Sequence, residues 1–134
     1  MALAQYRTMR PTGVWLPWVW GTGDYAGIYG EAVCGLQFKL VSGRQCGYRV
    51  AQFSNGMPWL PPVNSVYEPS DYAGVGAPIC GVWPGGMQYP GLQMRLHYRD
   101  TNSWTAWMTS DYNDYNNYEI YYRRYSYIDG IQFN

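Results

Sequence analysis

GDYAGIYGEAVCGLQFKL, residues 23–40, is the stretch that decides the fold, because parts of it return twice further along the chain. It begins with a glycine-rich turn. Leu36, Phe38 and Leu40 then share one face and alternate with polar residues, which is the two-residue period of a half-buried strand. We therefore expect a turn followed by a strand, repeated as a unit along the chain.

Two further copies of this unit follow. Residues 71–81 repeat the Asp-Tyr-Ala-Gly loop and place Cys80 where Cys34 stands in the first copy. A strand of the form Gly-apolar-Gln returns at residues 91–93 and again at residues 130–132. This match is too long to be accidental, so the sequence predicts three related units.

The three units share further landmarks. A Tyr-Arg pair opens each of them, at residues 6, 48 and 98, and we expect one tryptophan of each unit in an equivalent position: Trp18, Trp59 and Trp107. The second unit carries an insertion at residues 82–90, ahead of its closing strand. One domain, residues 1–134, therefore contains three repeats, at about 5–43, 46–96 and 97–134.

The composition predicts an all-β fold. Fifteen Tyr and 7 Trp favour strands, while 16 Gly and 9 Pro mark turns, and no long segment keeps the apolar period of a helix. About four short strands a unit give about twelve in all, which fits two closed threefold architectures. These are a pseudo-threefold β-prism, in which each unit forms one wall, and a β-trefoil.

Charge and hydropathy exclude several classes of partner. The net charge is zero, with nine residues of each sign, so no basic surface is expected for nucleic acid. We expect no membrane insertion, because no apolar segment is long enough to span a bilayer. The chain has no visible signal peptide and is expected to be soluble, and we expect it to act outside the cell or at a cell surface.

The three cysteines, Cys34, Cys46 and Cys80, cannot all pair within one chain. We expect buried free thiols, with a bridge from Cys46 to one of the others as the alternative. No Cys-x-x-Cys pair or Cys/His cluster indicates a metal, and no motif indicates a cofactor. We therefore expect neither.

The repeat pattern resembles the clostridial hydrophobic repeat with a conserved tryptophan. The resemblance rests on Trp-x-x-Trp, then Gly-Asp-Tyr-Ala-Gly-x-x-Gly, then Leu-x-Phe-x-Leu, and three degenerate copies cover nearly the whole chain. The last strands, residues 118–133, are also similar to the final Greek key of jacalin-type lectins, which are β-prisms, and this similarity leads us to favour the pseudo-threefold β-prism over the β-trefoil. The resemblance to the clostridial hydrophobic repeat implies adhesion or interaction at a cell surface without specifying a ligand.

The chain offers little for catalysis. Its one histidine, His97, stands at an expected strand junction, where a structural role is the preferred interpretation. The acidic residues fall mostly in turns and equivalent loops, so threefold repetition would place the repeated ones on different walls, too far apart to act as a pair. We therefore expect a protein that is not an enzyme.

The repeated Asp-Tyr pairs indicate a carbohydrate-binding protein, a lectin with up to three shallow sites for glycans or glycoconjugates. A carboxylate can accept hydrogen bonds from sugar hydroxyls, and an aromatic ring can pack against the C–H face of a sugar. Local turn bonding and core packing explain each single pair equally well. The candidate ligand-binding residues are Asp24, Tyr25, Asp71, Tyr72, Asp111 (or Asp114), Tyr112 (or Tyr115) and, on the inserted segment, Trp83, with Tyr89 beside it.

A self-assembling structural or surface protein is the alternative function. Fifteen tyrosines exceed what one small core can use, and protein interfaces favour Tyr, Trp and Met over Lys and Glu. Both hypotheses lead us to expect a homo-oligomer.

Overall fold

A computed structural model describes residues 4–43, 47–64, 72–83, 92–109 and 124–134 of the chain. These residues form an all-β fold with one short 3-10 turn, η1 (Gly21–Gly23). The expectation of an all-β protein is confirmed. The strands are β1 (Ala4–Met9), β2 (Val19–Trp20), β3 (Gly35–Leu40), β4 (Gly47–Gln52), β5 (Val63–Asn64), β6 (Ile79–Trp83), β7 (Gln93–Tyr98), β8 (Ser103–Trp104), β9 (Met108–Thr109) and β10 (Ile128–Phe133).

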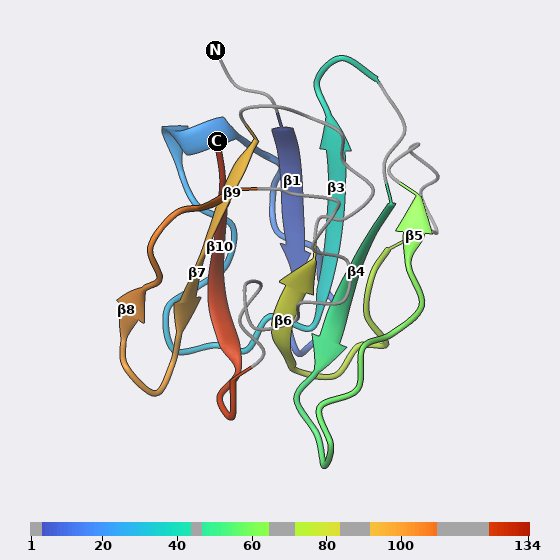
Figure 1. Ribbon diagram of the computed structural model, residues 1–134, viewed down its shortest axis with the longest axis vertical. Helices are drawn as coiled ribbons and strands as arrows, with labels where there is room; N and C mark the ends of the chain where they lie inside the picture. The colour runs from blue at the N-terminus through green and yellow to red at the C-terminus, as the bar shows by residue number, and fades with distance from the viewer. Residues whose placement is uncertain (1–3, 44–46, 65–71, 84–91, 110–123) are drawn as a thin grey trace.

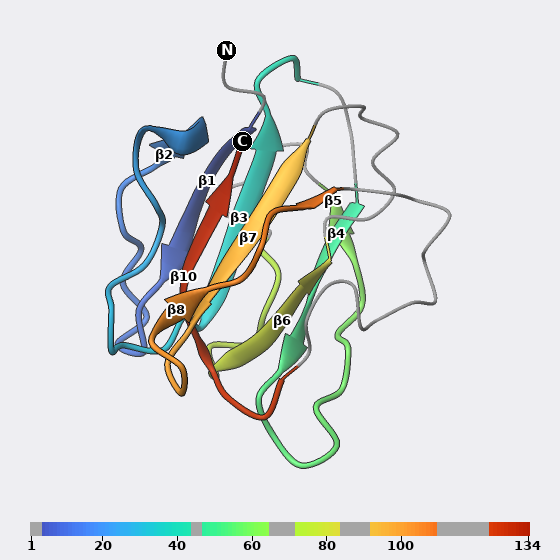
Figure 2. The ribbon, with the colours of Figure 1, turned by 60° about the vertical axis from the view of Figure 1, so that its left-hand side comes forward.

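The strands pair into three antiparallel sheets, one for each third of the chain (Figure 1). Their orders are β2-β1-β3, β5-β4-β6 and β10-β7-β8, and β9 also pairs with β7. In each sheet the first long strand of the unit lies in the centre, between a two-residue strand and the last strand of that unit. Figure 2 shows the same three groups of strands from a second direction. The described part of the chain thus repeats one sheet pattern three times.

The third sheet begins earlier than the sequence suggests. Residues 93–96, which we expected to close the second unit, form the first part of β7 and pair with β10. The closing strand of the second sheet is β6 instead. Trp83 pairs with Arg49 in the register in which Gln37 pairs with Arg7, so β6 is the counterpart of β3. The Gly-Leu-Gln motif led us to place the boundary between the second and third units too late. The motif resembles the sequence of an outer strand, but it leads into a central strand.

The three sheets share one apolar core. Tyr6 and Phe38 come from the first sheet, Tyr48 from the second and Phe133 from the third, and all four are buried. Phe38 lies 4.6 Å from Phe133 and 5.8 Å from Tyr48 between ring centroids, and Tyr6 meets Phe133 at 5.0 Å. Because each ring touches a ring of another sheet, no sheet buries its inner face alone.

Backbone hydrogen bonds join the sheets where their last strands begin. The Val33 amide donates to the Ile128 carbonyl at 2.8 Å, and the Ile79 amide donates to the Val33 carbonyl at 3.0 Å. These three residues are equivalent, since each stands two positions before the glycine of a last strand. The bonds connect the first sheet to both of the others.

On the face away from the core, each sheet carries an arginine packed between two indole rings. Arg7 lies 4.9 Å from the Trp15 ring centroid and 4.8 Å from Trp18. The guanidinium of Arg7 also donates through Nε to Gln37 at 2.6 Å. The same arrangement recurs with Arg95 between Trp104 and Trp107, bonded to Gln132, and with Arg49 between Trp59 and Trp83.

The equivalent tryptophans are therefore Trp15, Trp59 and Trp104, and the expected set of Trp18, Trp59 and Trp107 is wrong. Each member of the correct set pairs through its backbone with the residue two positions after the central arginine: Met9, Ala51 and His97. The shared Pro-Trp dipeptide suggested the other alignment, but strand register decides which residues occupy the same place.

Candidate ligand-binding site

The Tyr-Ala-Gly loops of the first two units each dock on a neighbouring sheet. Ala26 exchanges two backbone hydrogen bonds with Ile131 of β10, both 2.8 Å long. In the second unit Ala73 exchanges two bonds of 2.9 Å with Leu36 of β3. Each loop therefore covers the edge of the next sheet, which would otherwise present unpaired backbone groups.

The glycine after each of these alanines is required by this docking. Gly27 and Gly74 have φ values of +124° and +122°, which side-chain-bearing residues rarely adopt. A Cβ atom on Gly27 would lie 2.4 Å from the Asp129 carbonyl oxygen, and one on Gly74 would lie 3.0 Å from the Cys34 carbonyl oxygen. The small residues thus allow the backbone of the neighbouring sheet to approach closely.

The tyrosines of the Asp-Tyr pairs pack between units. Tyr25 meets Trp104 edge to face at 5.6 Å, and Tyr72 meets Trp15 in the same way at 5.3 Å. Tyr25 also stacks on Tyr29, with ring centroids 4.7 Å apart and planes 12° apart. Burial raises the pKa of Tyr25, and the neighbouring Tyr29 raises it further. Both rings take part in inter-sheet packing.

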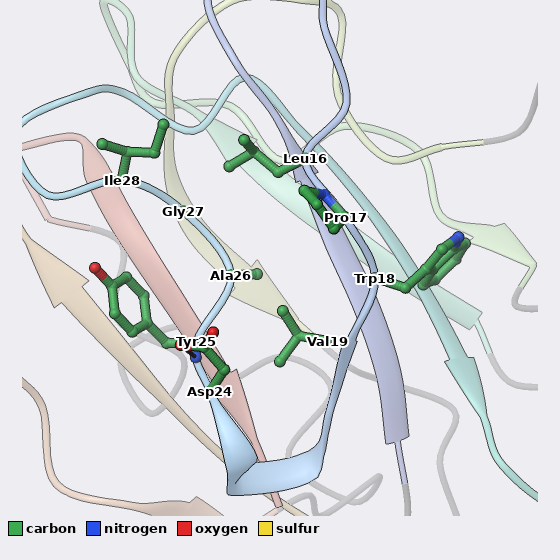
Figure 3. A pocket seen from close by; sticks show the side chains of 9 residues that line it. All are labelled: Leu16, Pro17, Trp18, Val19, Asp24, Tyr25, Ala26, Gly27 and Ile28. Atoms are coloured by element: carbon green, nitrogen blue, oxygen red, sulfur yellow. Dashed lines mark hydrogen bonds between the residues drawn. The ribbon is translucent and has the colours of Figure 1, made fainter.

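A cavity of about 200 Å³ lies between residues 16–19 and the loop at residues 24–28 (Figure 3). Most of its walls are aliphatic. Figure 3 shows the Tyr25 ring on the far side of the loop and the Trp18 ring turned away from the loop. The lining residues are Leu16, Pro17, Trp18, Val19, Asp24, Tyr25, Ala26, Gly27 and Ile28.

Asp24 is the acidic member of this lining, and it is exposed. Its Oδ1 accepts a 2.8 Å bond from the Tyr25 amide, which is the local turn bond expected of an aspartate here. Within the described residues the carboxylate makes no other hydrogen bond. Its main-chain carbonyl is held by the Gln132 amide group at 3.0 Å, so the residue is fixed while one carboxylate oxygen remains open to a ligand.

Trp18 lines the cavity, but two cationic side chains pack against its ring. Arg7 and Lys39 each lie 4.8 Å from the indole centroid. The ring therefore covers the outer face of the first sheet. Of the repeat-related elements expected at the first site, the structure brings Asp24 to the cavity and directs the aromatic rings elsewhere.

Trp83 is not on an inserted loop. It is the last residue of β6 and is 4% exposed, with its ring 4.7 Å from the Arg49 guanidinium. It takes the register position that Gln37 and Gln132 hold in the other sheets. The proline and glycines that follow it suggested a loop, whereas strand pairing continues through residue 83.

Several predicted site residues lie outside the described part of the chain: Asp71, Tyr89, Asp111, Tyr112, Asp114, Tyr115 and, among the cysteines, Cys46. Cys34 and Cys80 are both buried, and no disulfide joins them to each other. Burial raises the pKa of the Cys34 thiol.

A buried His–Asp pair was missed by the sequence reasoning. His97 Nδ1 bonds to Asp129 Oδ1, and the two residues are only 3% and 1% exposed. Asp129 Oδ2 accepts a 2.7 Å hydrogen bond from the Gly30 amide. The signal was present in the alignment of the units, because Asp129 stands where Cys34 and Cys80 stand, directly before the glycine of a last strand.

Neither metal ligands among the described residues nor a comparison with known proteins indicates a ligand class. Among the described residues, no group of three or more His, Cys, Asp or Glu side chains could hold a metal ion. The described residues also contain no helix with the length and apolar character needed to cross a bilayer. No family model, curated protein or solved structure matches this chain.

Proposed function

We propose that this protein binds carbohydrate without catalysis, and that its first site is the Asp24 cavity. The observation that carries the proposal is an exposed, fixed carboxylate beside a small cavity with aliphatic walls. A carboxylate oxygen can accept hydrogen bonds from sugar hydroxyls, and Leu16, Pro17 and Ile28 can pack against the C–H groups of a sugar. Aliphatic packing replaces the aromatic stacking expected from the sequence.

The cavity limits the kind of sugar. At about 200 Å³ it is smaller than the roughly 300–1,000 Å³ of sites for drug-sized ligands, so it suits one terminal sugar residue. Asp24 repels anionic sugars such as sialic acid and uronic acids. Each methyl group buried against the aliphatic walls contributes about 0.8 kcal/mol, which favours 6-deoxy and N-acetyl sugars.

We further propose that the three sheets are the walls of a β-prism built from three copies of the clostridial hydrophobic repeat. The common strand order, the shared core and the equivalent tryptophans support this interpretation. Single weak sites on a homo-oligomer would combine on a glycan-covered surface, where linked binding events strengthen one another.

Isothermal titration with a panel of methyl glycosides tests the proposed function. Asp24→Asn should raise Kd at least tenfold for every sugar that binds. Asp100→Asn is the control on an exposed aspartate outside the cavity. Its Oδ1 also accepts a 2.8 Å bond from the next amide, that of Thr101, and its Oδ2 accepts a 3.2 Å bond from Arg124. The proposal is refuted if the folded wild-type protein binds no sugar of the panel, or if the two substitutions change Kd equally.

Self-assembly is the second candidate function, and exposed aromatic side chains favour it. Trp20 is 54% exposed and Tyr125 is 72% exposed, and Tyr29 and Trp107 are also exposed. Aromatic residues are enriched in the cores of protein interfaces. Size-exclusion chromatography with light scattering separates the two functions, since large polymers support assembly and a monomer or small closed oligomer supports sugar binding.

A further inference from the structure

The first Asp-Tyr loop is one residue longer than the second. After the docked Ala-Gly pair and before the buried cysteine, the first loop has residues 28–33 and the second has residues 75–79. Gly30 and Gly76 correspond, because each has a positive φ, 88° and 79°, and each lies three positions before the residue at the three-sheet junction. The additional residue therefore lies between Gly27 and Gly30. Because Ile28 corresponds to Val75, as both are apolar and exposed, the additional residue is Tyr29.

Tyr29 lies directly over the buried histidine. Its ring centroid is 4.3 Å from that of His97 with planes 34° apart, and Tyr25 stacks on it as well. Its hydroxyl accepts a 3.0 Å hydrogen bond from Trp104 Nε1. The residue that lengthens the first loop thus attaches this loop to the third sheet.

The His–Asp pair beneath Tyr29 occurs in one unit of three. Asp129 holds the Gly30 amide through one carboxylate oxygen and His97 through the other. The corresponding positions in the other sheets carry apolar and thiol side chains, and those sheets form with the same strand order: Met9 with Cys34, and Ala51 with Cys80. The scaffold therefore does not need a buried, hydrogen-bonded polar pair at this place, and burying polar groups costs free energy.

These contacts fix the wall of the Asp24 cavity from both ends. Ala26 is held by its two bonds to Ile131, and Gly30 is held by Asp129. Ile28, which lines the cavity, lies midway between these two anchors. A loop that is ordered before a ligand arrives loses less conformational freedom on binding, so affinity rises.

We infer that the first loop, residues 24–30, recognises sugar without an equivalent contribution from the second loop, and that Asp129 and His97 are its positioning residues. The inference rests on the proposed function and sharpens it, since it assigns the cavity to one unit and gives the two described loops different roles. The second loop, residues 72–76, then serves as an inter-sheet connection.

Two measurements on the intact protein test this inference. Amide hydrogen exchange, which needs no ligand, should show at least tenfold faster exchange at Gly30 in Asp129→Asn, because an amide has one acceptor oxygen where the carboxylate uses two. Titration with methyl α-L-fucopyranoside, a neutral sugar with a methyl group, should show about a tenfold weaker Kd in the same variant. Deletion of Tyr29, which gives the first loop the length of the second, provides a second variant if Asp129→Asn does not fold.

Matched substitutions on the two loops complete the test. Ile28→Asp should abolish fucoside binding, whereas Val75→Asp, at the corresponding exposed position, should leave Kd and stoichiometry unchanged. Weaker binding or a lost site in Val75→Asp overturns the inference, as does faster Gly30 exchange with an unchanged Kd. A wild-type protein that binds none of the panel sugars refutes the proposed function itself, and exchange at Gly30 then still reports whether Asp129 holds the loop.

Discussion

Replacing Gly27 by alanine should destabilise the fold more than any other glycine substitution in the docked loops. The new Cβ would lie 2.4 Å from the Asp129 carbonyl oxygen, which is backbone and cannot rotate away. A residue with a side chain at φ +124° costs about 1–3 kcal/mol, and forced overpacking costs about 1–3 kcal/mol more. Displacing the loop would also weaken its two bonds to Ile131, so we expect a total loss of about 3–6 kcal/mol.

Urea unfolding followed by tryptophan fluorescence measures this loss, because domains of this size usually unfold in one cooperative step. Gly13→Ala is the control, since Gly13 also has a positive φ, +85°, but a Cβ atom there would meet no other atom within 4 Å, so only about 1–2 kcal/mol of backbone strain applies. Gly74→Ala should fall between the two, with its nearest atom at 3.0 Å. If Gly27→Ala and Gly13→Ala lose the same free energy of unfolding, the close contact between the loop and Asp129 is refuted.

Three further predictions concern the sheets and the core. Arg95→Met should lower the free energy of unfolding by about 1–3 kcal/mol in the same urea assay, because it removes two cation–π contacts and one hydrogen bond. Arg99→Met is the control: the Arg99 side chain is exposed, so its replacement should change the free energy of unfolding by less than about 0.5 kcal/mol. Burial raises the pKa of Tyr6 to about 12 from 10.0, so the buried neutral phenol contributes its full stability below pH 10. About 2–3 kcal/mol of the free energy of unfolding should be lost as the pH rises from 10 to 12 in the wild type but not in Tyr6→Phe, and alkaline unfolding measures this difference. Cys34 and Cys80 should react with a thiol reagent only after unfolding, and rapid labelling of either in the native protein would contradict their burial.

The alternation in residues 35–40 correctly predicted a strand with an apolar inner face, but it could not predict what covers the outer face. Leu36 and Phe38 are buried as expected. Gln37, on the opposite face, is also buried, because it bonds to Arg7 beneath the indole rings. A period-2 pattern describes the polarity along one strand. The burial of Gln37 depends on a different segment of the chain, which covers the outer face of the sheet.

Strand register explains the other differences. Trp59 aligns with Trp15 rather than with Trp18 because of its backbone partner, and a dipeptide match carries no information about that partner. Trp83 was assigned to a loop because of the residues that follow it. The Asp24 carboxylate was predicted at a ligand site and does border a cavity, but the direction of the Tyr25 ring depends on contacts with the third unit.

The docking of the first loop on the last strand also constrains when the protein can fold. Gly30 and Asp129 are 99 residues apart, so on the ribosome, at about 5–20 residues per second, the loop waits about 5–20 s for its partner strand. Until β10 is made, the first sheet has neither its final neighbour nor a closed core. We therefore expect the fold to close only once β10 has been synthesised, and refolding to be slow because the closing contacts are so distant in sequence.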